Sequence, residues 1–196
     1  MKIKNQTLFY VNSLPVNIDI DLDQQNGIYL LTGENGVGKS SLLNHFKIHR
    51  SLFLEKKCAF MDQFPLTPIN EIRVKDVLDL FEDGIADFDK ARALSLFNRY
   101  GLDYIIDRSI SLLSGGENQL LKFIFLLGQE ADIYFLDEPL QYIDEKRLAL
   151  LLEDIKKLSY SKCLLIVEHR SSLFENLELA QIQMQRNEQE IIVSGI

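Results

Sequence analysis

Two different spacings of apolar residues divide this chain into strands and helices. Between Val16 and Leu22 apolar and polar residues alternate strictly, which predicts a strand with one exposed face. Together with residues 3–11, this strand predicts a small antiparallel sheet near the N-terminus. Short continuous apolar runs are typical of buried strands instead. Such runs occur at residues 27–32, 58–61, 133–136 and 164–167.

Helical spacing of apolar residues occurs between these runs. After the first buried run, Leu42 and Phe46 fall on one helical face. Asp87 or Asp89 would cap a later helix, and Gly101 would end it. The further helices are predicted at residues 75–81, 89–100, 115–127 and 145–158, with a short one near residue 171.

The order of these elements predicts an α/β fold. Strands that alternate with helices indicate a parallel sheet covered on both faces. Residues 64–130 are mostly helical and interrupt the alternation, so we expect an inserted helical subdomain there. Within it, residues 64–72 carry two prolines and predict a loop. Near the C-terminus, residues 182–184 and 190–193 flank a predicted hairpin turn.

A glycine-rich segment follows the run at 27–32. It matches the pattern G-x-x-x-x-G-K-[ST] between a strand and a helix, which is the context this motif requires. Glycines let the backbone curl so that its N–H groups form an anion nest at a helix start. The lysine adds a cation for the outer phosphates, and the serine hydroxyl can ligate Mg²⁺. A chance match is the alternative, and the correct flanks argue against it. The segment predicts binding of a nucleoside triphosphate by Gly33, Glu34, Asn35, Gly36, Val37, Gly38, Lys39, Ser40 and the adjacent Ser41.

Composition narrows the class of protein. The 196 residues suit one core with a subdomain. The formal net charge of −8 argues against broad nucleic-acid binding, so no nucleic-acid partner is expected. Cys58 and Cys163 stand alone in apolar surroundings, which predicts core thiols in a reducing cytosol rather than a disulfide or a metal site. We expect no secretory leader, no membrane span and no regulatory domain after the last hairpin.

Two acids end the apolar run at 133–136. A strand end at a solvated turn is the plain structural alternative for Asp137 and Glu138. With a phosphate loop upstream the balance changes, because ligands collect at the carboxyl ends of parallel strands. Asp137 would then hold Mg²⁺, directly or through water. Glu138 would orient or deprotonate an attacking water.

A family resemblance rests on the segment Leu113-Ser114-Gly115-Gly116-Glu117. This segment resembles the Leu-Ser-Gly-Gly-Gln/Glu signature of the ATP-binding-cassette (ABC) ATPases. The family's other landmarks occur in the same order along nearly the whole chain. The resemblance implies a P-loop NTPase of ABC type, with a mixed central sheet, an N-terminal antiparallel β-subdomain and an inserted helical subdomain.

The same resemblance implies how the chain is organised. Residues 1–196 would form a single ABC ATPase domain. Its RecA-like core, with the antiparallel β-subdomain, would comprise residues 1–63 and 131–196. The helical subdomain at 64–130 would carry the signature.

Further residues match positions with known roles in the family. Gln63 resembles the glutamine that contacts Mg²⁺ and the water, and His169 resembles the switch histidine. Tyr10 lies at about the right distance upstream to stack on adenine, with Phe9 as the rival. The resemblance thus implies catalytic roles for Glu138, His169, Gln63 and Lys39. It implies Mg²⁺ ligands at Ser40, Gln63 and Asp137, and ATP contacts also at Ser114, Gly115, Gly116, Glu117 and the D-loop residue Asp144.

One phosphate loop and one signature provide only two half-sites. The resemblance implies head-to-tail pairing with a second ABC subunit, identical or homologous, around two Mg²⁺-bound ATP molecules. ATP hydrolysis would then drive transport through a separate membrane-spanning subunit. The chain would lie in the cytoplasm, peripheral to the inner face of the cell membrane.

Departures from the common pattern leave the subfamily open. Glu117 replaces the commoner Gln, and residues 140–144 read Leu-Gln-Tyr-Ile-Asp instead of Thr-Ser-Ala-Leu-Asp. The alternative to a transporter subunit is a soluble ABC ATPase that acts on ribosomes, DNA or protein complexes. A regulator that does not hydrolyse ATP is a third possibility, and the catalytic residues argue against it because all are present.

Overall fold

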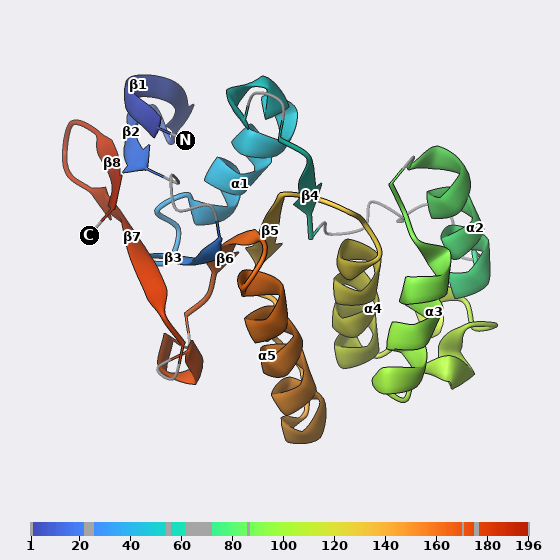
Figure 1. Ribbon diagram of the computed structural model, residues 1–196. Helices are drawn as coiled ribbons and strands as arrows, with labels where there is room; N and C mark the ends of the chain where they lie inside the picture. The colour runs from blue at the N-terminus through green and yellow to red at the C-terminus, as the bar shows by residue number, and fades with distance from the viewer. Residues whose placement is uncertain are drawn as a thin grey trace. The chain divides into compact units, whose positions relative to one another are not determined.

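The computed structural model describes residues 2–21, 26–53, 56–61, 72–85, 87–169, 171–174 and 177–195 (Figure 1). The chain divides into two compact units. One contains residues 1–60, 132–138 and 155–196, and the other contains residues 61–131 and 139–154. Each unit is built around its own secondary structure.

The first unit contains one mixed sheet of eight strands in the order β1-β2-β8-β7-β3-β6-β5-β4. Neighbouring strands are parallel along the part β7-β3-β6-β5-β4 of this order. Two pairs form antiparallel hairpins, β7 with β8 and β1 with β2. The strands are β1 (Lys2–Val11), β2 (Leu14–Asp21), β3 (Gly27–Gly33), β4 (Cys58–Phe60), β5 (Ile133–Asp137), β6 (Cys163–Val167), β7 (Leu179–Arg186) and β8 (Ile191–Gly195).

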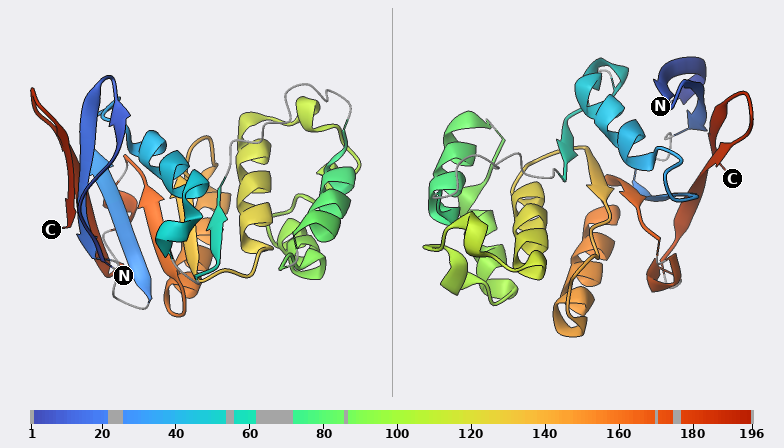
Figure 2. Two further views of the ribbon diagram at one scale, coloured as in Figure 1. Left: turned by 90° about the horizontal axis from the view of Figure 1, so that it is seen from above. Right: turned by 180° about the vertical axis from the view of Figure 1, so that it is seen from behind.

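The N-terminal hairpin is antiparallel, as the alternating pattern predicts. It does not stand apart from the central sheet, because β2 pairs in parallel with β8 from Val16↔Ile191 to Asp19↔Ser194. Figure 2 shows β1, β2, β8 and β7 side by side at one end of the sheet. The local pattern predicts each strand but carries no signal for this pairing, which joins segments about 175 residues apart.

The central strands are buried on both faces. All five residues of β6 are buried, as are four of the five residues of β5. On one face, Leu42, Leu43 and Phe46 of helix α1 (Lys39–Ile48) belong to the core together with Phe135. Such complete burial explains why these strands read as continuous apolar runs rather than alternating ones.

Aromatic rings fill this core around Phe135. The Phe60 ring stacks on it with centroids 4.3 Å apart, and Phe53 of the 3₁₀ helix η1 (Arg50–Phe53) meets it edge-on at 5.2 Å. Phe46 lies 5.9 Å away. Cys163 is buried in the same cluster, as predicted, while Cys58 is only partly buried against it.

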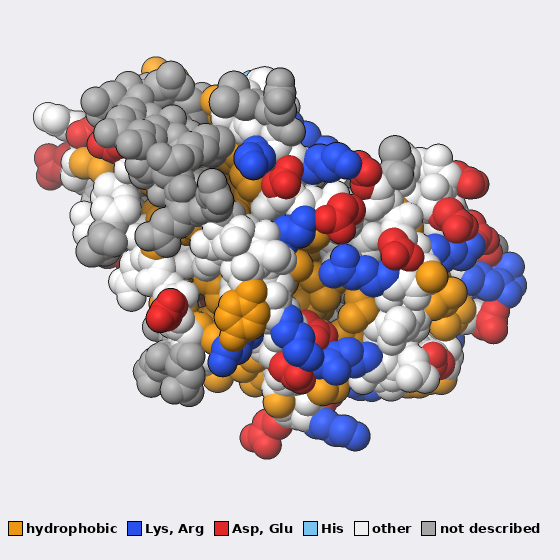
Figure 3. All heavy atoms as spheres, in the orientation of Figure 1, with side chains coloured by type: hydrophobic (Ala, Val, Ile, Leu, Met, Phe, Trp, Pro, Cys, Tyr) orange, Lys and Arg blue, Asp and Glu red, His pale blue; other side chains and the backbone are white. Residues whose placement is uncertain are grey.

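The second unit is helical. Helix α3 packs against α4, and the exposed charges on this unit are of mixed sign (Figures 2 and 3). For example, Lys90 pairs with both Asp79 and Glu82. The elements of this helical unit are α2 (Val74–Gly84), α3 (Lys90–Arg99), η2 (Asp103–Ile105), η3 (Ile110–Leu112), α4 (Gly115–Leu127) and the first ten residues of α5 (Glu145–Ser159). The short helix η4 (Ser171–Phe174) belongs to the first unit.

Helix α4 supplies the core of this unit. Its apolar residues from Leu120 to Leu127 are all at most 3% exposed, so the helix predicted at 115–127 is buried along this stretch. Phe125 contacts Phe81 at 4.5 Å and Phe88 at 5.8 Å between ring centroids. Within the described residues, no helix is both long enough and apolar enough to span a bilayer.

The ends of the helices follow from caps in the sequence. The Asp89 carboxylate accepts a hydrogen bond from the Arg92 N–H at the start of α3, and Gly101 follows its end at a φ of 63°. The helices at 75–81, 89–100, 115–127 and 145–158 are thus confirmed to within a few residues. Three short 3₁₀ turns, η1 to η3, were not predicted, because single turns have no period to detect. The loop expected at 64–72 lies almost wholly outside the described residues.

We expect Phe125→Ala to lower the free energy of unfolding of the helical unit by about 3–5 kcal/mol, because it leaves a cavity between Phe81 and Phe88. Urea denaturation followed by far-ultraviolet circular dichroism would measure it. Leu80→Ala is the control, since Leu80 on α2 is 58% exposed and its loss should change stability by less than about 0.5 kcal/mol. Equal losses in both variants would contradict this description of the core.

Candidate nucleotide-binding site

The phosphate loop connects β3 to α1 and depends on glycine at both ends. Gly33 has a φ of 152°, and a Cβ added to it would lie 2.4 Å from the carbonyl oxygen of Met184 on β7. Gly38, the N-cap of α1, has a φ of 113°, and a Cβ there would lie 3.0 Å from a methyl group of Val11. Any larger residue would push the loop away from the strands that hold it.

Lys39 is the first residue of α1 and is only 6% exposed. Its ammonium donates hydrogen bonds to the carbonyl oxygens of Gly33 at 2.9 Å and Glu34 at 3.0 Å, so it lies inside the curl of the loop. Burial lowers the pKa of Lys39, while the nearby charges of Glu138 and Asp137 raise it. The lysine and these two acids therefore belong to one electrostatic site.

Asp137 ends β5 and is partly buried. Burial raises the pKa of its carboxyl group, and a hydrogen bond with the Ser40 side chain acts in the opposite direction. Its Oδ1 atom is buried and has no hydrogen-bond partner among the described residues. A buried carboxylate oxygen without a partner is costly, and a cation is one way to satisfy it. Ser40 and Asp137 thus fit the oxygen-donor set that Mg²⁺ prefers.

Glu138 and His169 come together across two neighbouring strands. Asp137 of β5 is in register with Val167 of β6, so the residues that follow the two strands meet. The Glu138 N–H donates to the carbonyl of Val167 at 2.8 Å, and its Oε1 lies 3.0 Å from His169 Nε2. Glu138 has a φ of 48°, which costs about 1–3 kcal/mol for a residue other than glycine. The strain is concentrated at a residue whose carboxylate is partly exposed.

The two candidates for adenine stacking differ in their surroundings. The Phe9 ring stacks on His45 of α1 with centroids 4.6 Å apart and planes 14° apart. The neighbouring Tyr10 is 68% exposed. One face of Phe9 is therefore already covered, whereas Tyr10 is available to a ligand. Gln63, which the sequence also marks, lies outside the described residues.

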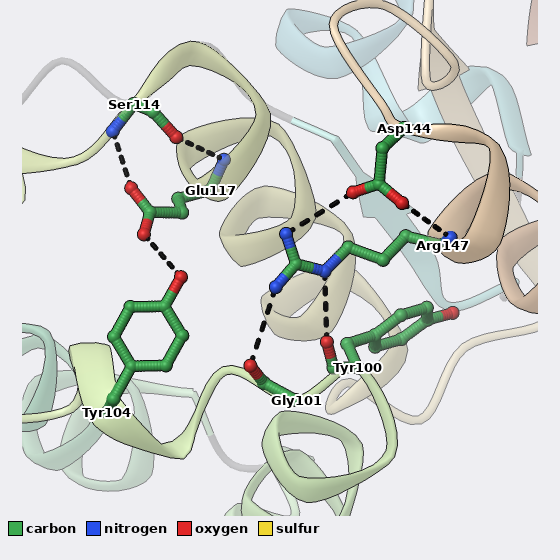
Figure 4. A network of polar contacts seen from close by, with 7 residues as sticks. All are labelled: Tyr100, Gly101, Tyr104, Ser114, Glu117, Asp144 and Arg147. Atoms are coloured by element: carbon green, nitrogen blue, oxygen red, sulfur yellow. Dashed lines mark hydrogen bonds and ion pairs between the residues drawn. The ribbon is translucent and has the colours of Figure 1, made fainter.

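The signature segment lies in the helical unit and forms the start of α4. Ser114 is the N-cap: its hydroxyl accepts from the Glu117 N–H at 3.3 Å, and the Glu117 carboxylate accepts from the Ser114 N–H at 2.7 Å. This reciprocal arrangement is a capping box (Figure 4). The Tyr104 hydroxyl donates to the other carboxylate oxygen at 2.6 Å, and this bond is the main cause of the lowered pKa of Glu117. The acid found in place of glutamine is thus stabilised as a carboxylate.

Asp144 caps the next helix, α5. Its carboxylate accepts from the Arg147 N–H at 3.0 Å, and this hydrogen bond is the main cause of its lowered pKa. The Arg147 guanidinium in turn donates to the carbonyl oxygens of Tyr100 at 3.1 Å and Gly101 at 3.4 Å, beyond the end of α3 (Figure 4). No motif in the sequence marks Arg147 or Tyr104. The spacing of three residues from Asp144 could have indicated a cap bond to Arg147, but nothing local points to Tyr104.

Comparison with known proteins identifies the family of this chain. The family model described as ABC transporter matches residues 16–141. The zinc transport system ATP-binding protein TroB of Treponema pallidum is 30% identical over 200 residues, which cover 86% of this chain and 72% of TroB. The translation initiation factor rli1 of Schizosaccharomyces pombe is 28% identical over 72% of this chain, but the match spans only 23% of that factor.

A solved structure of the ATP binding subunit of an ABC transporter has the same fold. It gives a TM-score of 0.75 at 18% identity, over 93% of this chain and 84% of the other. The mixed α/β P-loop fold of ABC type predicted from the sequence is thereby confirmed. Because the family model covers more than half of the chain, this protein belongs to the ABC transporter family, as one of its ATP-binding and ATP-hydrolysing cassettes.

Proposed function

We propose that this cassette hydrolyses ATP with Glu138 as the base, in a pair with a second cassette, and that it drives transport through a separate membrane-spanning chain. The observation that carries the proposal is the contact between Glu138 and His169, 3.0 Å apart beside the phosphate loop. A carboxylate and a histidine at this place can position a water molecule for attack on the terminal phosphate.

The residues of the first unit have different roles in binding and hydrolysing ATP. The N–H groups of the loop and the Lys39 ammonium bind the phosphates, and Lys39 exchanges the carbonyls of Gly33 and Glu34 for phosphate oxygens. The oxygen of the attacking water bonds to the γ-phosphorus while the bond between this phosphorus and the ADP oxygen breaks. Glu138 accepts the proton that the water loses. His169 holds the Glu138 carboxylate in place through its ring N–H. Tyr10 stacks on the adenine, since Phe9 already stacks on His45.

Ser40 and Asp137 would hold Mg²⁺, with Gln63 as a further ligand. The buried Oδ1 of Asp137 supports this assignment. When bound, the ion would neutralise negative charge on the phosphates. Before it binds, the hydrogen bond between Ser40 and Asp137 keeps the two donors together.

The signature supports pairing with a second cassette. Ser114 and the N–H groups of Gly115 and Gly116 lie at the N-terminus of α4, the end of a helix that favours anions. In the proposed head-to-tail pair, this end meets the terminal phosphate held by the other subunit, and Glu117 and Asp144 keep the segment in shape. ATP then holds the pair together, and hydrolysis releases it.

Coverage of the relatives favours transport over the ribosomal alternative. The chain spans 72% of TroB, a transport subunit, but only 23% of the translation factor. ATP hydrolysis in the cassette would drive a separate membrane-spanning chain, and the cassette would lie on the inner face of the membrane. Because TroB belongs to a zinc transport system, divalent metal ions are the cargo class to test first.

Membrane association can be tested by purifying the tagged chain from detergent-solubilised membranes of its own cells. We expect a protein with several membrane spans to co-purify with it in stoichiometric amount. Recovery with ribosomes instead, and none with membranes, would favour the alternative function. A tagged chain with Lys39→Ala serves as the control, since binding to the membrane partner should not need nucleotide.

We expect Glu138→Gln to bind ATP, to lose about 10²–10⁴-fold in kcat and to accumulate as an ATP-dependent dimer on gel filtration. The amide keeps the shape of the side chain but cannot accept the proton. Glu188→Gln, in the exposed turn before β8, is the matched control and should hydrolyse ATP normally. ATP turnover by Glu138→Gln at the wild-type rate would rule out Glu138 as the base.

We expect Lys39→Ala to weaken ATP binding by at least about tenfold, because it removes the one buried ammonium found among the described loop residues. Titration with a fluorescent ATP analogue would measure the affinity. Lys47→Ala, two turns further along α1, should leave the affinity unchanged. If Lys39→Ala and wild type bound nucleotide equally, the loop would not be the phosphate site.

A further inference from the structure

We propose that Arg108 and Tyr104 are positioning residues for the signature: they hold the Glu117 side chain and offset its negative charge at the helix start that meets the ATP of a second copy of this chain. The inference rests on the proposed function, since it concerns the same pairing. It arises from the acid at position 117, where the family commonly has a glutamine. Neither Arg108 nor Tyr104 belongs to the signature itself.

The Glu117 carboxylate is held at both of its oxygens. Glu117 is the third residue of α4, and only 9% of its surface is exposed. One oxygen accepts a hydrogen bond from the Ser114 N–H at 2.7 Å. The other accepts from the Tyr104 hydroxyl at 2.6 Å (Figure 4) and lies 3.9 Å from a guanidinium nitrogen of Arg108. The hydrogen bond from Tyr104 lowers the pKa of Glu117 most, and the charge of Arg108 acts in the same direction.

Arg108 and Tyr104 also hold each other. The Cζ atom of Arg108 lies 4.9 Å from the centroid of the Tyr104 ring, a cation–π contact that keeps a half-exposed guanidinium beside the carboxylate. The backbone of Arg108 is fixed as well, because its N–H donates to the carbonyl of Ile105 at 2.8 Å and its own carbonyl accepts from Val74 at 3.0 Å. Ile105, next to Tyr104 in η2, is fully buried. The two side chains are therefore placed by η2 and α2 rather than by α4.

The charge of Glu117 matters because of where the residue lies. The capping box uses the N–H groups of Ser114 and Glu117, so Gly115 and Gly116 offer the next N–H groups to an anion. A carboxylate in the first turn stabilises a helix, but it repels a second anion that binds at the same turn. A glutamine can close the same box without this repulsion. A cation and a hydroxyl donor beside the acid reduce the repulsion.

A gain in folding stability does not explain this arrangement. An ion pair with a half-exposed arginine at 3.9 Å ordinarily contributes little to stability. Its charge nevertheless changes the potential at the helix start, where a phosphate carries several negative charges into the proposed pair. We therefore expect the main effect of Arg108 on ATP-dependent pairing and not on folding.

The test is a double-mutant cycle in the Glu138→Gln background, which keeps ATP bound. Arg108→Gln removes the cation, Glu117→Gln removes the acid, and the double variant removes both. Sedimentation velocity at several protein concentrations, with Mg²⁺ and ATP, gives the dimer dissociation constant. Arg92→Gln is the matched control, because Arg92 pairs with Glu130 at the same distance of 3.9 Å elsewhere in the helical unit.

We expect Arg108→Gln to weaken the ATP-dependent dimer about fivefold or more when Glu117 is present, but less than about twofold when Glu117→Gln is present too. The loss should be larger at low salt, because salt screens the repulsion. Arg108→Lys, which keeps the charge, and Arg92→Gln should both pair within about twofold of the background. A merely structural role for Arg108 would not make its effect depend on the acid and on salt.

The pKa of Glu117 in the monomer provides a measurement that does not need pairing. NMR of the side-chain carboxyl carbons would follow its titration. We expect Tyr104→Phe to raise this pKa, because the variant removes the hydrogen bond that lowers it most, and Arg108→Gln to raise it less. An unchanged pKa in Tyr104→Phe would overturn the role of these residues in holding the carboxylate.

Equal weakening of the dimer by Arg108→Gln with and without the acid would overturn the inference, because Arg108 would then act independently of Glu117. Pairing unaffected by Arg108→Gln when Glu117 is present would overturn it as well. Failure of the Glu138→Gln protein itself to dimerise with ATP would instead overturn the proposed pairing. The failures are distinguishable, because only the last is seen with Arg108 and Glu117 intact.

Discussion

The parallel pairing of β3, β6 and β5 is the constraint on which the candidate site depends. Gly27–Leu31 pairs with Cys163–Val167, and Ile133–Asp137 pairs with the same strand from its other side. Parallel strands end at the same edge of a sheet, so three sequence segments far apart in the chain reach that edge together. Because of this pairing, the phosphate loop, the acids at the end of β5 and the histidine after β6 lie together at this edge.

Burial at this edge then gives the polar groups their properties. Lys39 is nearly buried, and its ammonium is held by two loop carbonyls and by the charges of two acids. Asp137 keeps one buried oxygen without a described partner. Burial of such groups costs free energy unless a partner of suitable charge or hydrogen-bonding capacity satisfies them. In the proposed function, an anion at the loop and a cation at the strand end would supply these partners.

The helical unit holds the N-terminus of helix α4 in a defined shape. The capping box of Ser114 and Glu117 fixes the first turn of α4, and Tyr104 fixes the carboxylate. On the other flank, Tyr142 lies against the glycine pair with its backbone under strain. Both supports depart from the family's commoner pattern: one has an acid in place of the commoner glutamine, and the other has an aromatic ring where the family commonly has alanine.

The sequence by itself determined the elements and the motifs, because these depend on neighbours along the chain. A phosphate loop needs glycine at Gly33 and Gly38, a capping box needs Ser114 and Glu117 three residues apart, and a buried strand needs a continuous apolar run. Only the tertiary structure decided which elements meet. The insertion of β8 between β2 and β7, the contact of His169 with Glu138 across 31 residues, and the stacking of Phe9 on His45 all come from long-range packing. Local patterns carry no record of such contacts, because their energy is gained only once the sheet has fixed its strand order and register.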